Sequence, residues 1–554
     1  MPHVSVSERR WVLVFAAVVM VLTTIPYVLG YAVEGIDYRF TGFVFAVEEG
    51  NSYIAKMLTG SYGAWLFRSP YTAYPQQGMF IYLPYILLGK LASPPGLHEQ
   101  LVALFHIFRF ISGILAILAT YDFLSFFLKN LSSRRIGLAL AVIGGGLGWL
   151  LVLLGKNIWL GSLPLDFYSP ETFGFLGIYG LPHLALGRAL ILWALLVYLR
   201  FSVKIFQGAS IEESSILDSR SILALSGLWL LAGLMQPLSM IIIGVVIAMH
   251  LIAIRLWYIF QHSKGDHAGL IDWWRVFRMV ALAGILPAIF VLYNLYMSFS
   301  DPYASTWIKQ NLVRSPHPAH YLLAYGLILP YAVLGCWLVA RKNPIKGWFL
   351  IGWVVIAPLL VYFPINLQRR LPDGVWVALV TLAMITFEEY VNTDNTNRVW
   401  KRWIWFTPLC HSFLTSAFLL AGGSLTLLKV TTPLFRPSNE VTAFEWIQSE
   451  IEPDSVVLAA YETGNPLPAW APVRVLIGHG PESSHLNALK LLVESFFSTT
   501  TSDQARLELL QKFDVDYVFY GPAEQSLGEW DPNPSSYLRL VYQSGDYSVF
   551  QFLP

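Results

Sequence analysis

Long apolar runs recur along this chain and constrain its fold more than any other feature. About 20 apolar residues cross the hydrocarbon core of a bilayer as a helix. Runs of roughly that length lie near residues 11–33, 101–127, 137–155, 183–203, 221–235, 236–258, 277–298, 319–340, 348–363, 373–390 and 403–428. The first run is longer than the apolar core of a signal peptide and has no small-residue cleavage site. The pattern predicts a polytopic α-helical membrane protein with about eleven spans, the first of them uncleaved.

The composition agrees with lipid as the solvent for most of the chain. Hydrophobic residues make up 55% of it and charged residues only 13%, whereas soluble domains carry roughly 25% charged residues. A formal net charge of +1 argues against a nucleic-acid partner, which would require a basic surface. Cys336 and Cys410 both fall inside apolar runs, so we expect neither a disulfide framework nor a zinc site from them.

The apolar segment 79–92 is too short to be a normal span. It has about 14 residues and contains Pro84, which favours a re-entrant or interfacial helix. Basic loop residues face the cytoplasm, and with 79–92 not crossing nearly all the Lys and Arg clusters fall on that side. These residues are Lys129, Arg134, Arg135, Lys204, Lys264, Arg275, Arg341, Lys342, Lys346, Arg398, Lys401 and Arg402. The opposite face then receives the loops 34–100, 156–182, 299–318 and 364–372.

A composition change after Lys429 marks a second domain. We expect residues 1–430 to form the membrane domain and residues 431–554 a soluble α/β domain on the extracytoplasmic side. Its expected elements are helices at 440–450, 486–498 and 503–513, strands at 455–460, 474–477 and 516–520, and a hairpin of 538–544 with 547–552. About 115 residues are enough for a separate core.

The first external loop carries the acidic residues best placed for acid–base chemistry. Asp37, Glu48 and Glu49 follow the first span closely, and aromatic residues and the interfacial segment come after them. A carboxylate near the membrane interface is partly desolvated, which can raise its pKa toward the working range of a general base. We expect Glu49 to be the general base, with Asp37 and Glu48 as the rival candidates.

Two further loops carry residues suited to an anionic ligand. His183 stands at the start of a predicted span, where it could bind a phosphate or an acceptor, or cap the helix. Gln368, Arg369 and Arg370 place two positive charges on the face that should be poor in them, and a lipid phosphate would account for this. The stretch 479–485 has two His and a Glu, but its spacing fits no zinc signature, and we read it as a loop between a strand and a helix.

These loops and spans together resemble the GT-C superfamily of polytopic glycosyltransferases, which includes protein O-mannosyltransferases and aminoarabinose transferases. Glu49 followed four residues later by Tyr53 is similar to the acidic residue and Tyr of that family's first external loop. The apolar segment 82–89, which ends in Gly, and Arg109 at the next span also resemble family features. The chain has Glu49 where relatives have Asp, and it lacks their Lys-Pro-Pro.

The resemblance implies an inverting sugar transfer from a polyprenyl-phosphate-linked donor to a lipid, glycan or protein acceptor outside the cytoplasm. Glu49 would deprotonate the acceptor hydroxyl, and Arg369 and Arg370 would stabilise the leaving phosphate. Tyr53, Arg109, His183 and Gln368 are the other residues expected to bind substrate.

No metal ligands are assigned, and a divalent cation is left open, because a monophosphate leaving group sets no requirement for one. Two other classes of protein also stay open at this point, a transporter and a non-catalytic scaffold. Few charges lie inside the predicted spans, whereas transporters commonly carry them there, which favours an enzyme over a transporter.

Overall fold

The structure is a computed structural model that describes residues 4–207, 214–261, 268–392 and 398–554. Lys264, one of the residues used above to orient the chain, lies outside them. The described chain divides into two compact units. Unit 1 comprises Met1–Thr24, Phe108–Tyr293 and Val313–Gly422, and unit 2 comprises Ile25–Ile107, Asn294–Leu312 and Gly423–Pro554. The predicted domain boundary at residue 430 stays a prediction.

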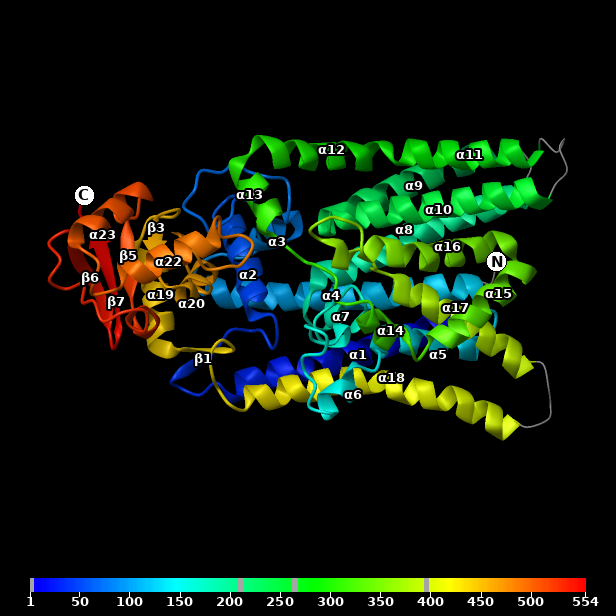
Figure 1. Cartoon of the computed structure of the whole chain (residues 1–554), viewed down its shortest axis with the longest axis horizontal. Helices are drawn as coiled ribbons and strands as arrows, with labels where there is room; N and C mark the ends of the chain where they lie inside the picture. The colour runs from blue at the N-terminus through cyan, green and yellow to red at the C-terminus, as the bar shows by residue number, and fades with distance from the viewer. Residues whose placement is uncertain (1–3, 208–213, 262–267, 393–397) are drawn as a thin grey trace. The chain divides into compact units, whose positions relative to one another are not determined.

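Unit 1 is built from long apolar helices that lie side by side (Figure 1). Its helices are α5 (Leu131–Ile143), α6 (Gly148–Leu153), α7 (Phe175–Gly180), α8 (Pro182–Phe206), α9 (Ser214–Met235), α10 (Leu238–Gln261), α11 (Ala268–Ala283), α14 (Ala319–Tyr325), α15 (Leu329–Lys342), α16 (Pro344–Val361) and α17 (Val375–Asn392), with 3-10 turns η1 (Leu165–Phe167) and η2 (Gln368–Arg370). Helices α1 (Val6–Val33), α4 (Leu97–Phe127), α12 (Ile285–Ser300) and α18 (Arg398–Leu427) contribute to both units.

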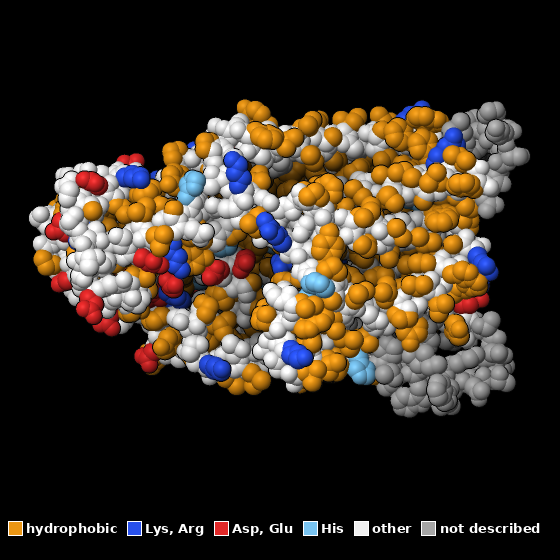
Figure 2. Space-filling view, in the orientation of Figure 1, with side chains coloured by type: hydrophobic (Ala, Val, Ile, Leu, Met, Phe, Trp, Pro, Cys, Tyr) orange, Lys and Arg blue, Asp and Glu red, His pale blue; other side chains and the backbone are white. Residues whose placement is uncertain are grey.

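The membrane class predicted from the sequence is confirmed. Among the described residues, 7 helices are long and apolar enough to cross a bilayer, or up to 9 if each of two bent pairs is one span. The chain is therefore a multi-pass membrane protein. Hydrophobic side chains cover most of the visible face over the helices of unit 1, whereas Asp and Glu side chains gather over the C-terminal sheet (Figure 2).

The segment 137–155 differs from its prediction, because it is not one continuous span. Three consecutive glycines, Gly144 to Gly146, separate α5 from α6. The backbone N–H of Gly145 donates to Ser412 Oγ at 3.0 Å, and Thr415 Oγ1 donates to the carbonyl oxygen of Gly146 at 3.3 Å. Polar side chains of α18 thus replace the hydrogen bonds that a helix would have supplied, as a chain break at membrane depth requires.

The structure supports a non-spanning segment at 79–92. Its helix α3 (Leu83–Gly89) has 7 residues, far too few to cross a bilayer. It packs closely on α2 (Val47–Ser61) through two glycines. A Cβ on Gly89 would lie 1.8 Å from the carbonyl oxygen of Met57, and one on Gly60 would lie 2.1 Å from that of Ile86. The close approach of the two helices therefore depends on these glycines.

The C-terminal part of unit 2 forms a mixed five-stranded sheet in the order β4-β3-β5-β7-β6. The strands are β3 (Val456–Leu458), β4 (Arg474–Val475), β5 (Tyr517–Tyr520), β6 (Leu538–Ser544) and β7 (Tyr547–Phe552), and the helices are α19 (Ser438–Glu450), α20 (Tyr461–Gly464), α21 (Leu467–Trp470), α22 (Leu486–Phe496), α23 (Asp503–Lys512) and α24 (Pro522–Gln525). β3 pairs in parallel with β4 and β5, and the β6–β7 hairpin is antiparallel. The predicted α/β fold is confirmed, down to the bounds of the hairpin.

A short strand pair is one of the connections between the first loop and the C-terminal sheet region within unit 2. β1 (Tyr38–Phe40) pairs antiparallel with β2 (Phe435–Pro437), which precedes α19. The remaining helix of this unit is α13 (Pro302–Gln310). Segments nearly 400 residues apart in sequence thus meet around α2, since the Thr41 hydroxyl donates to the carbonyl oxygen of Leu434 across 393 positions.

A buried carboxyl group gives the C-terminal sheet region a pH dependence. Glu524 is fully buried and accepts the backbone N–H groups of Ala460 and Gly521, each at 2.9 Å. Burial raises the pKa of Glu524 from 4.5 to about 7. Between these values the folded chain holds a proton that the unfolded chain has lost, so stability falls as pH rises through this window.

We predict that Glu524→Gln removes this pH dependence, which amounts to about 3 kcal/mol across the window. The Gln amide cannot accept the N–H of Gly521, so a constant loss of stability is also expected, and the slope against pH is the readout. Thermal unfolding of the purified protein between pH 4.5 and 7 measures it. Glu462→Gln, at an exposed position, is the control. An unchanged slope in Glu524→Gln would contradict the assignment.

Candidate active site

The acidic pair of the first loop lies in the first turn of α2. Ala46, immediately before the helix, has a left-handed backbone with φ of 49°, which turns the chain sharply into α2. Glu48 and Glu49 follow, and both are exposed. A helix N-terminus favours negative charge, so this position suits two carboxylates. Asp37 lies elsewhere, in the exposed turn before β1, where its carbonyl oxygen accepts the N–H of Ser438 at 2.8 Å.

The two glutamates have different surroundings. The Tyr461 hydroxyl donates to Glu48 Oε2 at 3.0 Å, and Asn465 Nδ2 lies 3.4 Å from the Glu48 carbonyl oxygen. The Glu49 carboxylate, by contrast, has no hydrogen bond or ion pair within the part of the chain that the structure describes. Of the pair, Glu49 is therefore the carboxylate with both oxygen atoms available to a ligand.

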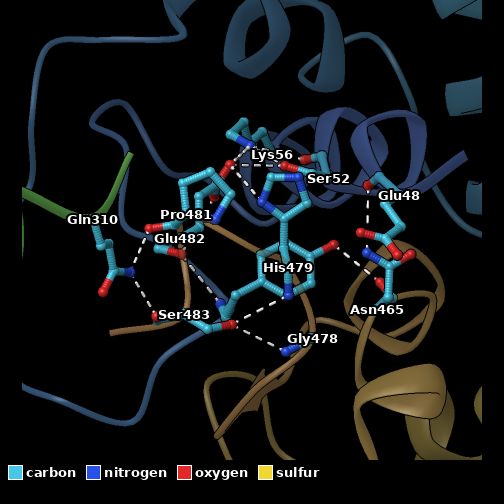
Figure 3. A network of polar contacts seen from close by, with 12 residues as sticks. Glu48, Ser52, Lys56, Gln310, Asn465, Gly478, His479, Pro481, Glu482 and Ser483 are labelled. Carbon is cyan, nitrogen blue, oxygen red and sulfur yellow. Dashed lines mark hydrogen bonds and ion pairs between the residues drawn. The ribbon is translucent and has the colours of Figure 1, made fainter. Parts of the chain in front are cut away.

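A buried ion pair lies further along α2. Lys56 Nζ is 2.7 Å from Glu482 Oε1, and both side chains are almost completely buried. Ser52 Oγ, one turn before Lys56, donates to the same Glu482 oxygen at 2.9 Å and also accepts a hydrogen bond from Lys56. Ser69 Oγ lies 3.3 Å from the other carboxylate oxygen. These four residues and His479 form what we call the Lys56–Glu482 network, of which Figure 3 labels Ser52, Lys56, His479 and Glu482.

His479 completes this network. Its Nδ1 lies 3.5 Å from Glu482 Oε1, and its ring packs beside that of Tyr71. Burial lowers the pKa of His479; the Glu482 carboxylate opposes this shift and the Lys56 charge adds to it, and the net direction is downward, which favours the neutral imidazole. The loop that carries it is fixed by Ser483, whose Oγ accepts the N–H groups of Gly478 and His479.

Burial disfavours the charged form of both members of the pair. Burial alone would raise the pKa of Glu482, but the Lys56 charge and the hydrogen bonds from Lys56 and Ser52 outweigh it and lower that pKa overall. Burial lowers the pKa of Lys56, and the Glu482 carboxylate opposes this. The Lys56 ammonium also lies 4.4 Å from the ring centroid of Tyr82, a favourable cation–π distance.

Sequence reasoning did not identify Lys56, Asn465 or Glu482 as site residues. One signal was available, because Glu49, Ser52 and Lys56 are spaced three and four apart and so share a face of one helix. Nothing in the sequence, however, paired Lys56 with Glu482, which lies 426 residues away. The stretch 479–485 does form a loop before a helix, as predicted, but two of its residues are buried in this network.

Tyr53 faces α3. Its ring stacks on that of Tyr85 with centroids 4.6 Å apart and planes 8° apart. The stack positions Tyr53 one turn after Glu49, and its expected role in binding substrate stays a prediction.

The basic cluster 368–370 belongs to unit 1, where it forms η2 before α17. The Arg369 guanidinium lies 4.4 Å from the ring centroid of Tyr168, and its buried Nε has no hydrogen-bond partner among the described residues. Arg370 Nε is 3.7 Å from Glu171 Oε1 and is partly exposed. With its amide oriented to satisfy both neighbours, Gln368 donates to the Phe363 carbonyl and accepts from the Ser315 N–H.

A second buried ion pair supports this cluster. Arg188 Nε lies 2.6 Å from Asp373 Oδ1, at the start of α17. Its Nη2 donates to the carbonyl oxygens of Pro170 and Glu171 at 2.7 and 3.3 Å. Arg188 therefore joins the loop that bears Glu171 to the turn that follows Arg370.

The other two predicted substrate-binding residues of unit 1 are buried. Arg109 donates to the hydroxyls of Thr23 and Thr24 at 3.1 and 2.7 Å, so its guanidinium joins α4 to α1. His183 is buried in the first turn of α8. Among the described residues, no three His, Cys, Asp or Glu side chains are grouped to hold a metal ion.

Known structures share this fold, although no protein-family model and no curated protein matches the chain. The apo oligosaccharyltransferase of Archaeoglobus fulgidus matches with a TM-score of 0.55 and 13% identity, over 93% of this chain and 70% of that one. Apo ArnT from Cupriavidus metallidurans matches with a TM-score of 0.52 and 13% identity, over 98% of each chain. The arabinofuranosyltransferase AftD from Mycobacteria matches with a TM-score of 0.57 and 12% identity, over 98% of this chain but 41% of that one.

The chain therefore shares its fold with these solved glycosyltransferases, and this is the fold that the first-loop and span resemblance implied. At 12–13% identity the comparisons establish the fold only. The chemistry of the chain depends on its own residues.

We predict that Arg188→Met strongly destabilises the protein, by about 3–5 kcal/mol, because it leaves the Asp373 carboxylate buried without its partner. Arg188→Met/Asp373→Leu should recover most of the loss, since apolar residues can replace a buried pair. Arg200→Met, at an exposed position of the same helix, is the matched control. Thermal unfolding in detergent compares the four proteins. Equal midpoints for Arg188→Met and Arg200→Met would contradict the prediction.

Proposed function

We propose that the protein is a membrane glycosyltransferase that moves a sugar from a polyprenyl-phosphate-linked donor to a hydroxyl of an extracytoplasmic acceptor. The observation that carries this proposal is the environment of Glu49. It is an exposed carboxylate at the start of α2 with no partner among the described residues, on a chain with the GT-C fold. Glu48, held by Tyr461, is the weaker candidate for the general base.

The proposed sugar transfer needs a base for the acceptor hydroxyl and positive charge for the departing lipid phosphate. An acceptor oxygen attacks the anomeric carbon of the donor while Glu49 takes its proton, and the bond from that carbon to the phosphate oxygen breaks. The lipid phosphate leaves with one more negative charge than it had in the donor. We assign the stabilisation of that charge to Arg369 and Arg370, because fixed guanidinium groups suit a developing phosphate anion.

The named activities of the structural neighbours support this class of reaction. An oligosaccharyltransferase and an arabinofuranosyltransferase share the fold. The Archaeoglobus enzyme has also been solved with a tethered acceptor peptide. In our proposal the first loop and the C-terminal domain lie outside the cytoplasm, and the acceptor is a lipid, a glycan or a protein.

We predict that Glu49→Gln lowers the rate of sugar transfer at least about 100-fold, because the amide cannot accept the proton. Glu49→Asp should retain measurable activity, and Glu48→Gln is the matched control that should keep most of it. The assay supplies radiolabelled polyprenyl-phosphate sugars and membrane extract to the purified protein. Sugar transfer by Glu49→Gln at the wild-type rate would show that Glu49 is not the general base. No transfer by the wild type with any donor would favour the transporter or scaffold class.

We predict that Arg369→Ala/Arg370→Ala raises KM for the donor and lowers kcat, each by about 10-fold or more, because two charge-assisted contacts to the phosphate are lost. Lys156→Ala, which removes an exposed positive charge from the loop after α6, is the control. Kinetics at several donor concentrations separate the two constants. A double variant with the kinetics of the control would exclude the phosphate role.

A further inference from the structure

Several polar contacts of α2 come from the C-terminal residues of unit 2. Glu48 is bound by Tyr461 and Asn465, as described above. Asn51 Nδ2 donates to Asn465 Oδ1 at 2.8 Å, and Ser52 and Lys56 both bind Glu482. Figure 3 shows Ser52 and Lys56 of α2 meeting Glu482 of the loop that carries His479. The face of the helix that begins with the acidic pair is thus fixed over two turns.

An ion pair is an unusual way to fix a helix at a completely buried position. Removing two charges from water costs free energy that their attraction only partly returns, and two apolar side chains would hold the helix at least as well. What an ion pair supplies instead is a defined geometry. Glu482 accepts from Lys56 and Ser52 at one oxygen atom and from Ser69 at the other, which fixes both the rotation and the axial position of α2.

The rotation of α2 decides where Glu49 points. Glu49, Ser52 and Lys56 share a helical face, so a helix held at Ser52 and Lys56 presents Glu49 in one direction. The Lys56 charge also attracts the Glu49 carboxylate along that face. A general base must lie within hydrogen-bond reach of the proton it removes, and small misplacements are costly to the rate.

We infer that Lys56 and Glu482 are positioning residues for Glu49, so that the C-terminal domain is a working part of the reaction site. This inference rests on the proposed function. The donor phosphate is assigned to Arg369 and Arg370, so loss of the Lys56–Glu482 pair should act on kcat and leave KM for the donor unchanged. The C-terminal domain would then position Glu49, whether or not it also recognises the acceptor.

The test uses two double variants, because either single variant leaves a buried charge alone and endangers the fold. Lys56→Met/Glu482→Met replaces the pair with apolar side chains, and Lys56→Gln/Glu482→Gln keeps polar groups without charge. We expect a folded protein with kcat at least 10-fold lower and unchanged KM. Lys512→Met/Glu508→Met, an exposed pair of opposite charges on α23, is the matched control and should behave as the wild type.

The rate of disulfide formation between α2 and the C-terminal domain tests the same inference without an activity assay. In Asn51→Cys/Asn465→Cys, with Cys336 and Cys410 replaced by Ala, a disulfide between positions 51 and 465 reports the pose of α2. We expect its rate of formation to fall about 10-fold when Lys56→Met/Glu482→Met is added. Wild-type kcat together with an unchanged disulfide rate would overturn the inference. So would failure of both double variants to fold, because the pair would then serve the fold itself.

These outcomes are distinct from failure of the proposed function. If Glu49→Gln is as active as the wild type, the proposed base is wrong, whatever the disulfide rate shows. If Glu49→Gln is inactive while the folded double variants keep full kcat, the base stands and the positioning role is wrong.

Discussion

The structure depends first on one constraint, that every backbone N–H and C=O in hydrocarbon needs a partner within the protein. The long helices of unit 1 meet it by themselves. Where the chain breaks at Gly144 to Gly146, hydroxyls of α18 supply the missing partners. Chemistry that requires irregular backbone and free polar groups is consequently confined to the segments that connect the helices. The acidic first turn of α2 lies in the segment between α1 and α4, and the basic turn η2 lies between α16 and α17.

How far the sequence predicts this structure depends on the range of the interactions. The β6–β7 hairpin was predicted to the residue because alternating side chains and Gly545 at the turn are local signals. The span at 137–155 was predicted wrongly as continuous. Its apolar composition is that of a span, and the hydroxyls that allow the break lie more than 260 positions further along the chain.

The candidate site shows the same limit. Glu48 and Glu49 are visible in the sequence as a carboxylate pair after the first span. Their unequal environments are not, because Tyr461 and Asn465 lie more than 400 positions away. The 479–485 stretch was read as a connecting loop for want of a metal-like spacing, and that reading was right about its backbone. It could not reveal that Glu482 is buried against Lys56. Charged residues are almost never fully buried unless they are paired, and the sequence does not show that Lys56 pairs with Glu482.

The two units solve the same physical problem in the same way. In unit 2 the exposed Glu49 lies on a helix fixed by the buried Lys56–Glu482 pair, and in unit 1 the partly exposed Arg370 lies in a turn fixed by the buried Arg188–Asp373 pair. A group that reacts or binds must be open to its ligand, and an exposed charged side chain gains little order from its own contacts. Its direction has to come from the backbone that carries it. A buried ion pair fixes that backbone through hydrogen bonds of defined geometry, whereas apolar packing tolerates small rotations and shifts. If Glu49 and Arg370 act as we propose, the direction that the two pairs give to these exposed groups offsets the free-energy cost of burying the charges.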